Sequence, residues 1–232
     1  MTKAILLDIE GTTTPIDFVH NTLFPFAKAR IAGFVQENLE GLKFELGQLA
    51  AEYAGDHDYN GEFRPDSANS VSDYLKYLID QDRKSTALKS IQGLIWQKGY
   101  ESGDLVSSVF DDVPPALKRW KDAGKSVAIF SSGSVLAQRL IFKYSDHGDL
   151  TQLIDAYFDT TAGAKREADS YRGIAGGLEM DAGDVIFVSD IPAELDAART
   201  AGLQSVLCMR NGNAEIKEDH SYRAIESFDS LD

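Results

Sequence analysis

The chain contains little of several residue types, and each shortage excludes a class of protein. Cys208 is the only cysteine among 232 residues, so no disulfide can form within the chain, which suits a reducing compartment. No apolar run approaches the ~18 residues that a membrane span requires. The first residues also lack the basic segment and apolar stretch of a signal peptide. We therefore expect a cytoplasmic protein with no membrane partner.

Basic residues are scarce as well. Lys and Arg number 23 against 37 Asp and Glu, and the formal net charge is −14. Nucleic acids and anionic membranes repel such a surface, so we expect no nucleic-acid partner. A small anionic substrate is compatible with this charge, because its site can be locally positive. The length allows a sizeable core in one large domain or two small ones, and we expect a monomer.

The first dozen residues combine a buried strand with acidic side chains. The apolar run 4–7 is too short for a helix, and Gly11 ends it abruptly. Asp8 and Glu10 follow where this strand stops. Ligands bind at the carboxyl ends of strands in open α/β sheets, so these carboxylates are candidates for a metal site, a nucleophile or an acid–base pair. A solvated loop after an edge strand is the alternative.

Residues 107–232 alternate between apolar strands and helices. This pattern predicts a doubly wound parallel sheet with right-handed crossovers, an α/β fold. The segment 222–231 is a candidate for an additional edge strand. The strands that we expect after the first are 126–130, 154–158, 185–188 and 204–208.

Between these parts, apolar residues recur at helical spacing. Four amphipathic helices are predicted in the region 17–106, the third with a capping box at Ser70 and Asp73, and the fourth ending near Gly99. This all-helical region interrupts the α/β pattern, so we interpret it as an inserted cap domain. The domain prediction is therefore a catalytic core of residues 1–16 and 107–232, with a cap of residues 17–106.

The residues that follow each predicted strand share a chemistry. A parallel sheet would bring them to one edge, where hydroxyls, a helix N-terminus and a lysine form a phosphate cradle. Carboxylates beside such a cradle require a cation, and Mg²⁺ is the usual one. The residues are Asp8 and Glu10 after the first strand, Ser131 and Ser132 after the second, Lys165 after the third, and Asp190 after the fourth.

One further acidic loop resembles the start of a calcium site. The segment from Asp56 to Gly61 has the spacing of an EF-hand loop, but Ser67 stands where a bidentate glutamate belongs, and Pro65 interrupts the approach to the next helix. We interpret this segment as an interhelical loop rather than a Ca²⁺ site.

Four segments together resemble the motifs of the haloacid dehalogenase superfamily, whose members are mostly phosphatases with a nucleophilic aspartate. They are Asp8-Ile-Glu-Gly-Thr, Phe130-Ser-Ser-Gly-Ser, Lys165 and Val188-Ser-Asp-Ile-Pro-Ala-Glu. The superfamily usually has an aspartate two residues after the nucleophile, whereas this chain has Glu10. That departure, with the segments 13–20 and 95–103, is similar to the enolase-phosphatases of methionine salvage, and the resemblance covers nearly the whole chain.

The resemblance implies a function and a cofactor. Enolase-phosphatases enolise 2,3-diketo-5-methylthiopentyl 1-phosphate and then remove the phosphate to give an acireductone, with Mg²⁺ as the cofactor. A phosphatase of the same fold that acts on another small phosphomonoester is an alternative. A non-catalytic binding protein of this fold is another alternative, which the presence of Asp8 and Lys165 disfavours.

The resemblance also implies residue roles. Asp8 matches the nucleophile that becomes an aspartyl-phosphate, and Glu10 matches the acid–base residue, whose backbone carbonyl reaches the metal. Asp8, Glu10 and Asp190 thus form the expected metal set. Phosphate binding falls to Ser131, Ser132 and Lys165, and Glu194 matches a further acidic position beside them.

The base that removes the carbon-bound proton during enolisation is a separate question. The side chains of the core motifs already have other expected roles, so none of them is an evident candidate for this base. The candidates are His20, Lys98 and Glu101, which fall where the cap and core sequences meet.

Overall fold

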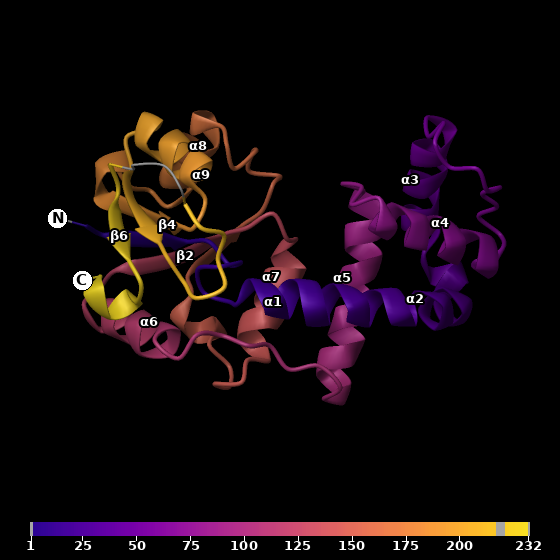
Figure 1. Ribbon diagram of the computed structural model, residues 1–232, viewed down its shortest axis with the longest axis horizontal. Helices are drawn as coiled ribbons and strands as arrows, with labels where there is room; N and C mark the ends of the chain where they lie inside the picture. Colours follow the sequence, from indigo (N-terminus) through magenta and orange to yellow (C-terminus); the bar gives the residue numbers. More distant parts are fainter. Residues whose placement is uncertain (1, 217–220, 232) are drawn as a thin grey trace. The chain divides into compact units, whose positions relative to one another are not determined.

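A computed structural model describes residues 2–216 and 221–231 of the chain. Six parallel strands form one sheet in the order β3-β2-β1-β4-β5-β6 (Figure 1). The predicted α/β fold is confirmed, including the edge strand in the segment 222–231. The strands are β1 (Ala4–Leu7), β2 (Ser126–Phe130), β3 (Ala156–Phe158), β4 (Val185–Ser189), β5 (Gln204–Cys208) and β6 (Arg223–Ile225).

Helices cover both faces of the sheet. Every residue of β1 is buried, as expected for a central strand of a parallel sheet. The side chains of Ala4 and Leu6 pack in the cluster formed with α8 (Ala168–Gly177) and α9 (Pro192–Thr200). Helix α6 (Val113–Asp122) packs against β2, and α7 (Val135–Lys143) packs against β3. Figure 1 shows α8 and α9 on one side of the strands and α6 on the other.

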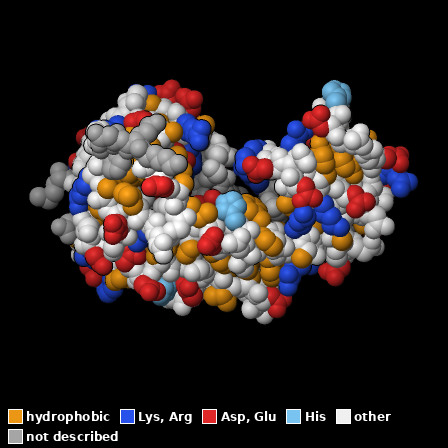
Figure 2. All heavy atoms as spheres, in the orientation of Figure 1, with side chains coloured by type: hydrophobic (Ala, Val, Ile, Leu, Met, Phe, Trp, Pro, Cys, Tyr) orange, Lys and Arg blue, Asp and Glu red, His pale blue; other side chains and the backbone are white. Residues whose placement is uncertain are grey.

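The chain divides into two compact units. The core unit comprises Met1–Val19 and Val106–Asp232, and the helical unit comprises His20–Leu105. The expected boundaries were 16/17 and 106/107, within a few residues of these divisions. On the face drawn in Figure 2, acidic side chains are scattered over both units and do not gather in one patch.

The helical unit contains the predicted helices. They are α2 (Phe24–Asn38), α3 (Lys43–Ala54), α4 (Ala68–Asp80) and α5 (Thr86–Ser102). The short segments α1 (Ile16–Phe18) and Val19–Leu23 lead into α2. Within residues 2–216 and 221–231, no helix combines the length and the apolar character that crossing a bilayer requires.

Two predicted helix limits are wrong. Helix α5 continues past Gly99 to Ser102. Gly99 does not end the helix but allows close packing of the Phe26 ring, since a Cβ on Gly99 would lie 2.3 Å from Cζ of that ring. Helix α4 begins at Ala68 and is capped by Ser67, whose Oγ accepts from the backbone N–H of Ser70. The Ser70 hydroxyl donates to the carbonyl of Glu62, so it does not form the predicted capping box.

Candidate active site

The site lies at the carboxyl end of two neighbouring strands. Leu7 of β1 pairs with Val188 of β4, so the residues that follow, Asp8 and Ser189, emerge side by side. The backbone N–H of Asp8 donates to the carbonyl of Val188 at 3.0 Å. The pairing of apolar strands thus brings together side chains 181 positions apart in sequence.

Lys165 is the centre of the site. Its Nζ lies 2.7 Å from Oδ1 of Asp8 and 2.7 Å from Oε2 of Glu194, and the lysine is only 8% exposed. The hydroxyl of Tyr171 donates to the Lys165 carbonyl at 2.6 Å, which fixes the backbone of the loop between β3 and α8. A buried ammonium with two carboxylate partners is well placed to hold an anionic group.

Ser189 joins the two carboxylates that flank Lys165. Its Oγ lies 3.0 Å from Oδ2 of Asp8 and 3.1 Å from Oε2 of Glu194, and it accepts from the backbone N–H of Ile191. Both oxygens of Asp8 are therefore held, since Oδ1 also accepts from the backbone N–H of Ile9 at 2.7 Å. Asp8 is fixed in orientation before any substrate binds.

Negative charge exceeds positive charge in this network. Asp8, Asp190 and Glu194 are buried carboxyl groups, and Lys165 is the ammonium among them. Burial and the charge of Asp8 raise the pKa of Asp190 to about 7, and the same two causes raise that of Glu194 to about 7. Burial acts to lower the pKa of Lys165, but the charges of Asp8 and Glu194 outweigh it and raise that pKa.

The surplus of carboxylates fits a divalent cation. Oδ1 of Asp190 is buried with no hydrogen-bond partner in this structure. A Cβ on Gly11 would lie 2.5 Å from Oδ2 of Asp190, so only glycine leaves room beside this carboxylate. Oxygen donors of this kind suit Mg²⁺, which binds through one or two carboxylates, waters and substrate phosphate.

The described part of the chain has no cluster of three or more His, Cys, Asp or Glu side chains arranged to hold a metal. A metal here would therefore rely on the carboxylates of Asp8 and Asp190, with the remaining ligands from backbone oxygen, water and phosphate. The expected contribution of the Glu10 backbone carbonyl to the metal stays a proposal.

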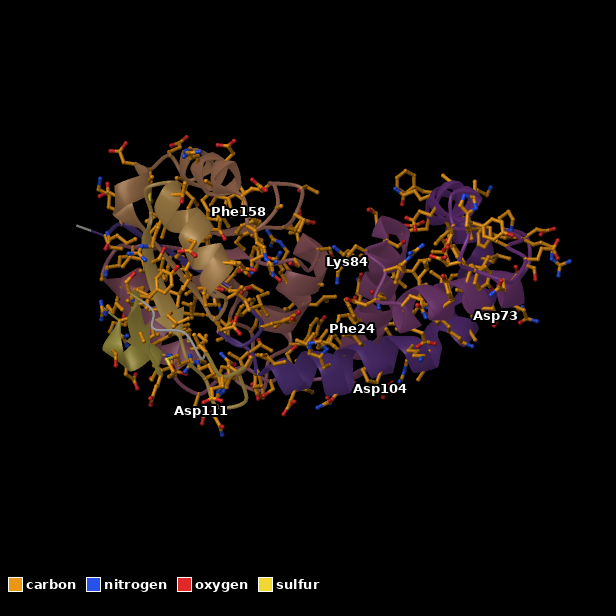
Figure 3. All side chains as sticks on the ribbon, turned by 45° about the horizontal axis from the view of Figure 1, so that its top comes forward. Phe24, Asp73, Lys84, Asp104, Asp111 and Phe158 are labelled. Atoms are coloured by element: carbon orange, nitrogen blue, oxygen red, sulfur yellow. The ribbon has the colours of Figure 1, made fainter. Side chains whose placement is uncertain are left out.

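Glu10 and the two serines occupy positions around this network. Glu10 is exposed in the turn after β1. Ser131 is buried at the end of β2, where its Oγ accepts from the N–H of Gly133 at 3.1 Å. Ser132 follows it and is exposed, just before helix α7. Because β2 is parallel to β1, both serines lie at the sheet edge that carries Asp8. Phe158, labelled in Figure 3, ends the next strand, β3.

The candidate enolisation bases belong to the helical unit. Lys98 and Glu101 lie on α5, where Lys98 is 3.5 Å from Glu37 and Glu101 accepts a hydrogen bond from Gln97. His20 is exposed at the start of the unit, and its ring centroid lies 5.8 Å from that of Phe24.

Lys98 and Glu101 line a groove between α2 and α5 with a volume of about 720 Å³. Arg30 and Asp104 form an ion pair of 3.9 Å in this groove, and Asp104 is labelled in Figure 3. Both candidates thus face a hollow of the helical unit, and their part in catalysis stays a proposal.

Two members of the site lie outside the roles that the sequence motifs predict. The motifs assign no role to Ser189 and imply only a further acidic position for Glu194, yet both side chains contact the Asp8–Lys165 pair. The signal was present in the segment 188–194. A strand that ends in serine and leads into a helix with glutamate in its first turn places both side chains at one strand end.

Comparison with known proteins identifies the family. The haloacid dehalogenase-like hydrolase family matches residues 2–202. Enolase-phosphatase E1 of Synechococcus elongatus is 51% identical over 236 residues, covering 98% of this chain and 96% of the relative. Enolase-phosphatase E1 of Drosophila persimilis is 44% identical, covering 99% of this chain and 94% of the relative.

A solved structure is similar to this chain over its full length. The UTR4 protein of Saccharomyces cerevisiae has a TM-score of 0.84 and 34% identity, covering 100% of both chains. The chain therefore belongs to the haloacid dehalogenase-like hydrolases and, among them, to the enolase-phosphatase E1 family.

Proposed function

We propose that this protein enolises 2,3-diketo-5-methylthiopentyl 1-phosphate and then hydrolyses the enol phosphate to an acireductone and phosphate. The observation that carries the proposal is the buried network of Asp8, Lys165, Ser189 and Glu194. It combines a fixed carboxylate with a buried ammonium at the strand ends, in a chain 44–51% identical to enzymes named for both reactions.

We propose that Asp8 is the nucleophile. An oxygen of its carboxylate attacks phosphorus, a P–O bond forms, and the bond between phosphorus and the enol oxygen breaks. The ammonium of Lys165 offsets the negative charge of the phosphoryl oxygens, which otherwise repel Asp8. Phosphoryl transfer depends mainly on such positioning and charge neutralisation. Ser131 and Ser132 hold the phosphoryl oxygens from the end of β2.

Glu10 is assigned two proton transfers in this proposal. It protonates the departing enol oxygen, and it then takes a proton from the water that attacks phosphorus and releases Asp8. Glutamate carries its carboxyl about one methylene further from the backbone than the aspartate usual in the superfamily. A general acid of this kind contributes typically about 10²–10⁴-fold to a rate.

Mg²⁺ is the proposed cofactor, held by Asp8, Asp190 and the carbonyl of Glu10. When bound, it would supply positive charge to the phosphoryl oxygens. The surplus negative charge at Asp8, Asp190 and Glu194 and the unpartnered Oδ1 of Asp190 support this assignment. The expectations of a monomer and of a cytoplasmic location stay predictions.

The test compares substrates. Release of inorganic phosphate from the diketo phosphate is measured beside a panel of other small phosphomonoesters, each with Mg²⁺ and with EDTA. The proposal predicts the highest kcat/KM for the diketo phosphate, formation of the acireductone, and loss of activity in EDTA. Higher kcat/KM for another phosphomonoester would favour the general phosphatase of the same fold.

The enolisation step has its own experiment. The variant Glu10→Gln is expected to accumulate the enol phosphate, which ultraviolet absorbance and phosphorus NMR detect. Lys98→Ala or Glu101→Ala is expected to slow enol formation and to spare hydrolysis of a simple phosphomonoester. If Glu10→Gln yields no intermediate and both helical-unit variants lose the two activities in parallel, this division of roles is wrong.

A further inference from the structure

The loop after β5 carries an amide side chain whose oxygen atom is buried. Asn213 lies in this loop, and its Nδ2 donates to the carbonyl of Gly11 at 2.9 Å and to that of Cys208 at 3.4 Å. Both amide protons are used in this way, so the two carbonyls fix which end of the amide is nitrogen and which is oxygen. The oxygen, Oδ1, is buried and has no hydrogen-bond partner among the described residues.

This oxygen faces the space beside Asp190. A Cβ on Gly11 would lie 2.9 Å from Oδ1 of Asn213 and 2.5 Å from Oδ2 of Asp190, so both oxygens lie within 2.9 Å of one point. Oδ1 of Asp190 is also buried without a partner among the described residues, and the aspartate is only 9% exposed. A carboxylate and an amide oxygen therefore reach the same space, which glycine leaves open because it has no Cβ.

Two acceptors that face one space require a partner with protons or positive charge. An unpaired buried acceptor is costly, and such atoms in a folded protein indicate a water or an ion that binds there. Lys165 does not supply this partner, because its Nζ contacts Asp8 and Glu194, each at 2.7 Å. A divalent cation with the waters that it retains supplies both the charge and the protons.

We propose that Asn213 belongs to the cation site at Asp190, where its Oδ1 accepts a hydrogen bond from a water that Mg²⁺ retains. This inference rests on the proposed Mg²⁺ cofactor. Mg²⁺ usually keeps several waters, so groups that hold those waters contribute to its affinity. The bonds to the carbonyls of Gly11 and Cys208 hold the amide in one orientation, and the oxygen is therefore in place before the cation binds.

The test measures cation binding rather than turnover. Mn²⁺ prefers the same oxygen ligands as Mg²⁺, and free Mn²⁺ has an electron paramagnetic resonance signal that is lost on binding. Titration of the full chain with Mn²⁺ at pH 8, followed by competition with Mg²⁺, gives the Kd of each ion. For Asn213→Ala we expect the Kd of Mg²⁺ to rise about 10–10²-fold, as for other groups that orient the ligands of a metal.

A second variant separates the oxygen from the contacts with the backbone. Asn213→Asp keeps an acceptor of the same size but loses both donors to the carbonyls of Gly11 and Cys208. We expect a lower Tm of the metal-free protein, because a carboxylate oxygen then faces those carbonyls. The Kd of Mg²⁺ should be no weaker than that of the wild type, because the oxygen that faces Asp190 is retained.

Two further variants complete the comparison. Asn211→Ala makes the same truncation on an exposed residue of the same loop, and it should leave both Kd and Tm unchanged. If circular dichroism shows that Asn213→Ala does not fold, Asn213→Ser replaces it. A hydroxyl on Cβ falls short of the position of Oδ1, so a loss of the same order is expected.

The outcomes separate the role of Asn213 from the cation site itself. An unchanged Kd in the truncated Asn213 variant overturns the role of Asn213. Equal weakening in that variant and in Asn213→Asp overturns it as well, because the backbone contacts and not the oxygen then set the affinity. If only Asp190→Asn loses Mg²⁺ binding, the cation site stands without Asn213. If Asp190→Asn binds Mg²⁺ as tightly as the wild type, both proposals fail.

Discussion

Both units bury carboxyl side chains. In the helical unit, positive charge and hydrogen-bond donors match the buried carboxylate, whereas in the core unit they do not. In the helical unit, Asp56 is paired with Arg83 at 3.1 Å and accepts from the hydroxyl of Tyr74 at 3.2 Å and the N–H of Asp58. Burial acts to raise the pKa of Asp56, but these hydrogen bonds and the Arg83 charge outweigh it and lower that pKa. The first carboxylate of the loop that resembles an EF-hand is thus occupied by partners within the helical unit.

In the core unit the balance is reversed. Asp8 and Glu194 pair with Lys165, Asp190 is a third buried carboxyl group of the site, and the pKa values of Asp190 and Glu194 are raised to about 7. A buried charge whose partners match it contributes to structure, whereas an unmatched cluster requires a ligand. The comparison supports the proposal that a cation and an anionic substrate bind at the core cluster.

The largest effect is expected at the nucleophile. Asp8→Asn keeps the size of the side chain, but an amide cannot attack phosphorus. Phosphate release should fall by more than about 10⁴-fold, as removal of a nucleophile does in other enzymes. Phosphate is assayed on protein whose circular dichroism matches the wild type. Turnover near the wild-type value would remove Asp8 from the nucleophile role.

Loss of the shared ammonium should cost less. Lys165→Ala leaves the phosphate charge and the carboxylates uncompensated, and a loss of about 10²–10³-fold in kcat/KM is expected. Steady-state kinetics with the same substrate measure it. Lys121→Ala, which removes a more exposed lysine that pairs with Asp155, is the matched control and should not change the kinetics.

The hydroxyl of Ser189 should have an intermediate effect. Ser189→Ala removes the hydrogen bond to Oδ2 of Asp8, so the nucleophile is less well oriented, and a loss of about 10-fold in kcat is expected from one bond to a charged group. Kinetics and thermal unfolding are measured on the same sample. A drop in Tm with unchanged kcat would show that this hydroxyl is structural.

Cation binding should depend on pH through the raised pKa of Asp190. Its ordinary pKa is 3.8 and its folded pKa is about 7, so the folded state binds the extra proton between these values. This contribution to stability is complete below about pH 4 and is lost as the pH rises through about 7. Mg²⁺ must displace that proton, so it should raise Tm more at pH 8 than at pH 6.

Asp190→Asn provides the control for this prediction. Without Mg²⁺ at pH 8, the variant should unfold at a higher temperature than the wild type by about 2–4 °C or more, since 1 kcal/mol gives such a shift at this size. Added Mg²⁺ should shift it little. An equal Mg²⁺ effect at both pH values would argue against a cation at Asp190.

The smallest effect is expected at Asp56, the buried carboxylate whose partners match its charge. Tyr74→Phe removes the hydroxyl that donates to Asp56, as Ser189→Ala does for Asp8, but Arg83 and a backbone N–H remain. We expect about 1 kcal/mol of lost stability by urea unfolding and an unchanged kcat. A large loss of activity would contradict the distinction between Asp56, which we assign to structure, and the carboxyl cluster of the core unit, which we assign to catalysis.

Much of the core unit could be predicted because its signals are local. Short apolar runs that end in Asp8, Ser131 and Asp190 predict parallel strands whose ends carry polar side chains. The helices of the helical unit follow from the spacing of their apolar residues, and in α4 the apolar residues at this spacing, Val71, Tyr74, Leu75 and Leu78, are buried.

The errors have a common cause in contacts between distant segments. Asp112 stands at the N-cap of α6, but its carboxylate accepts from Arg210 at 2.9 Å and from the N–H of Phe228 at 2.6 Å instead of from its own helix. Gly99 was expected near the end of its helix, but it lies within α5, where the Phe26 ring of α2 packs on it. Such pairings depend on the folded chain and have no periodic pattern in the sequence.

The most direct test of the account is chemical trapping at Asp8. Substrate is mixed with the Mg²⁺-loaded enzyme, the reaction is stopped during turnover, and borohydride reduces any acyl phosphate to the alcohol. Peptide mass spectrometry then reads residue 8. We expect homoserine in place of aspartate at this position in wild-type protein with substrate, and unchanged aspartate without substrate. Turnover with aspartate intact at position 8 in every sample, or trapping at another carboxylate, would contradict it.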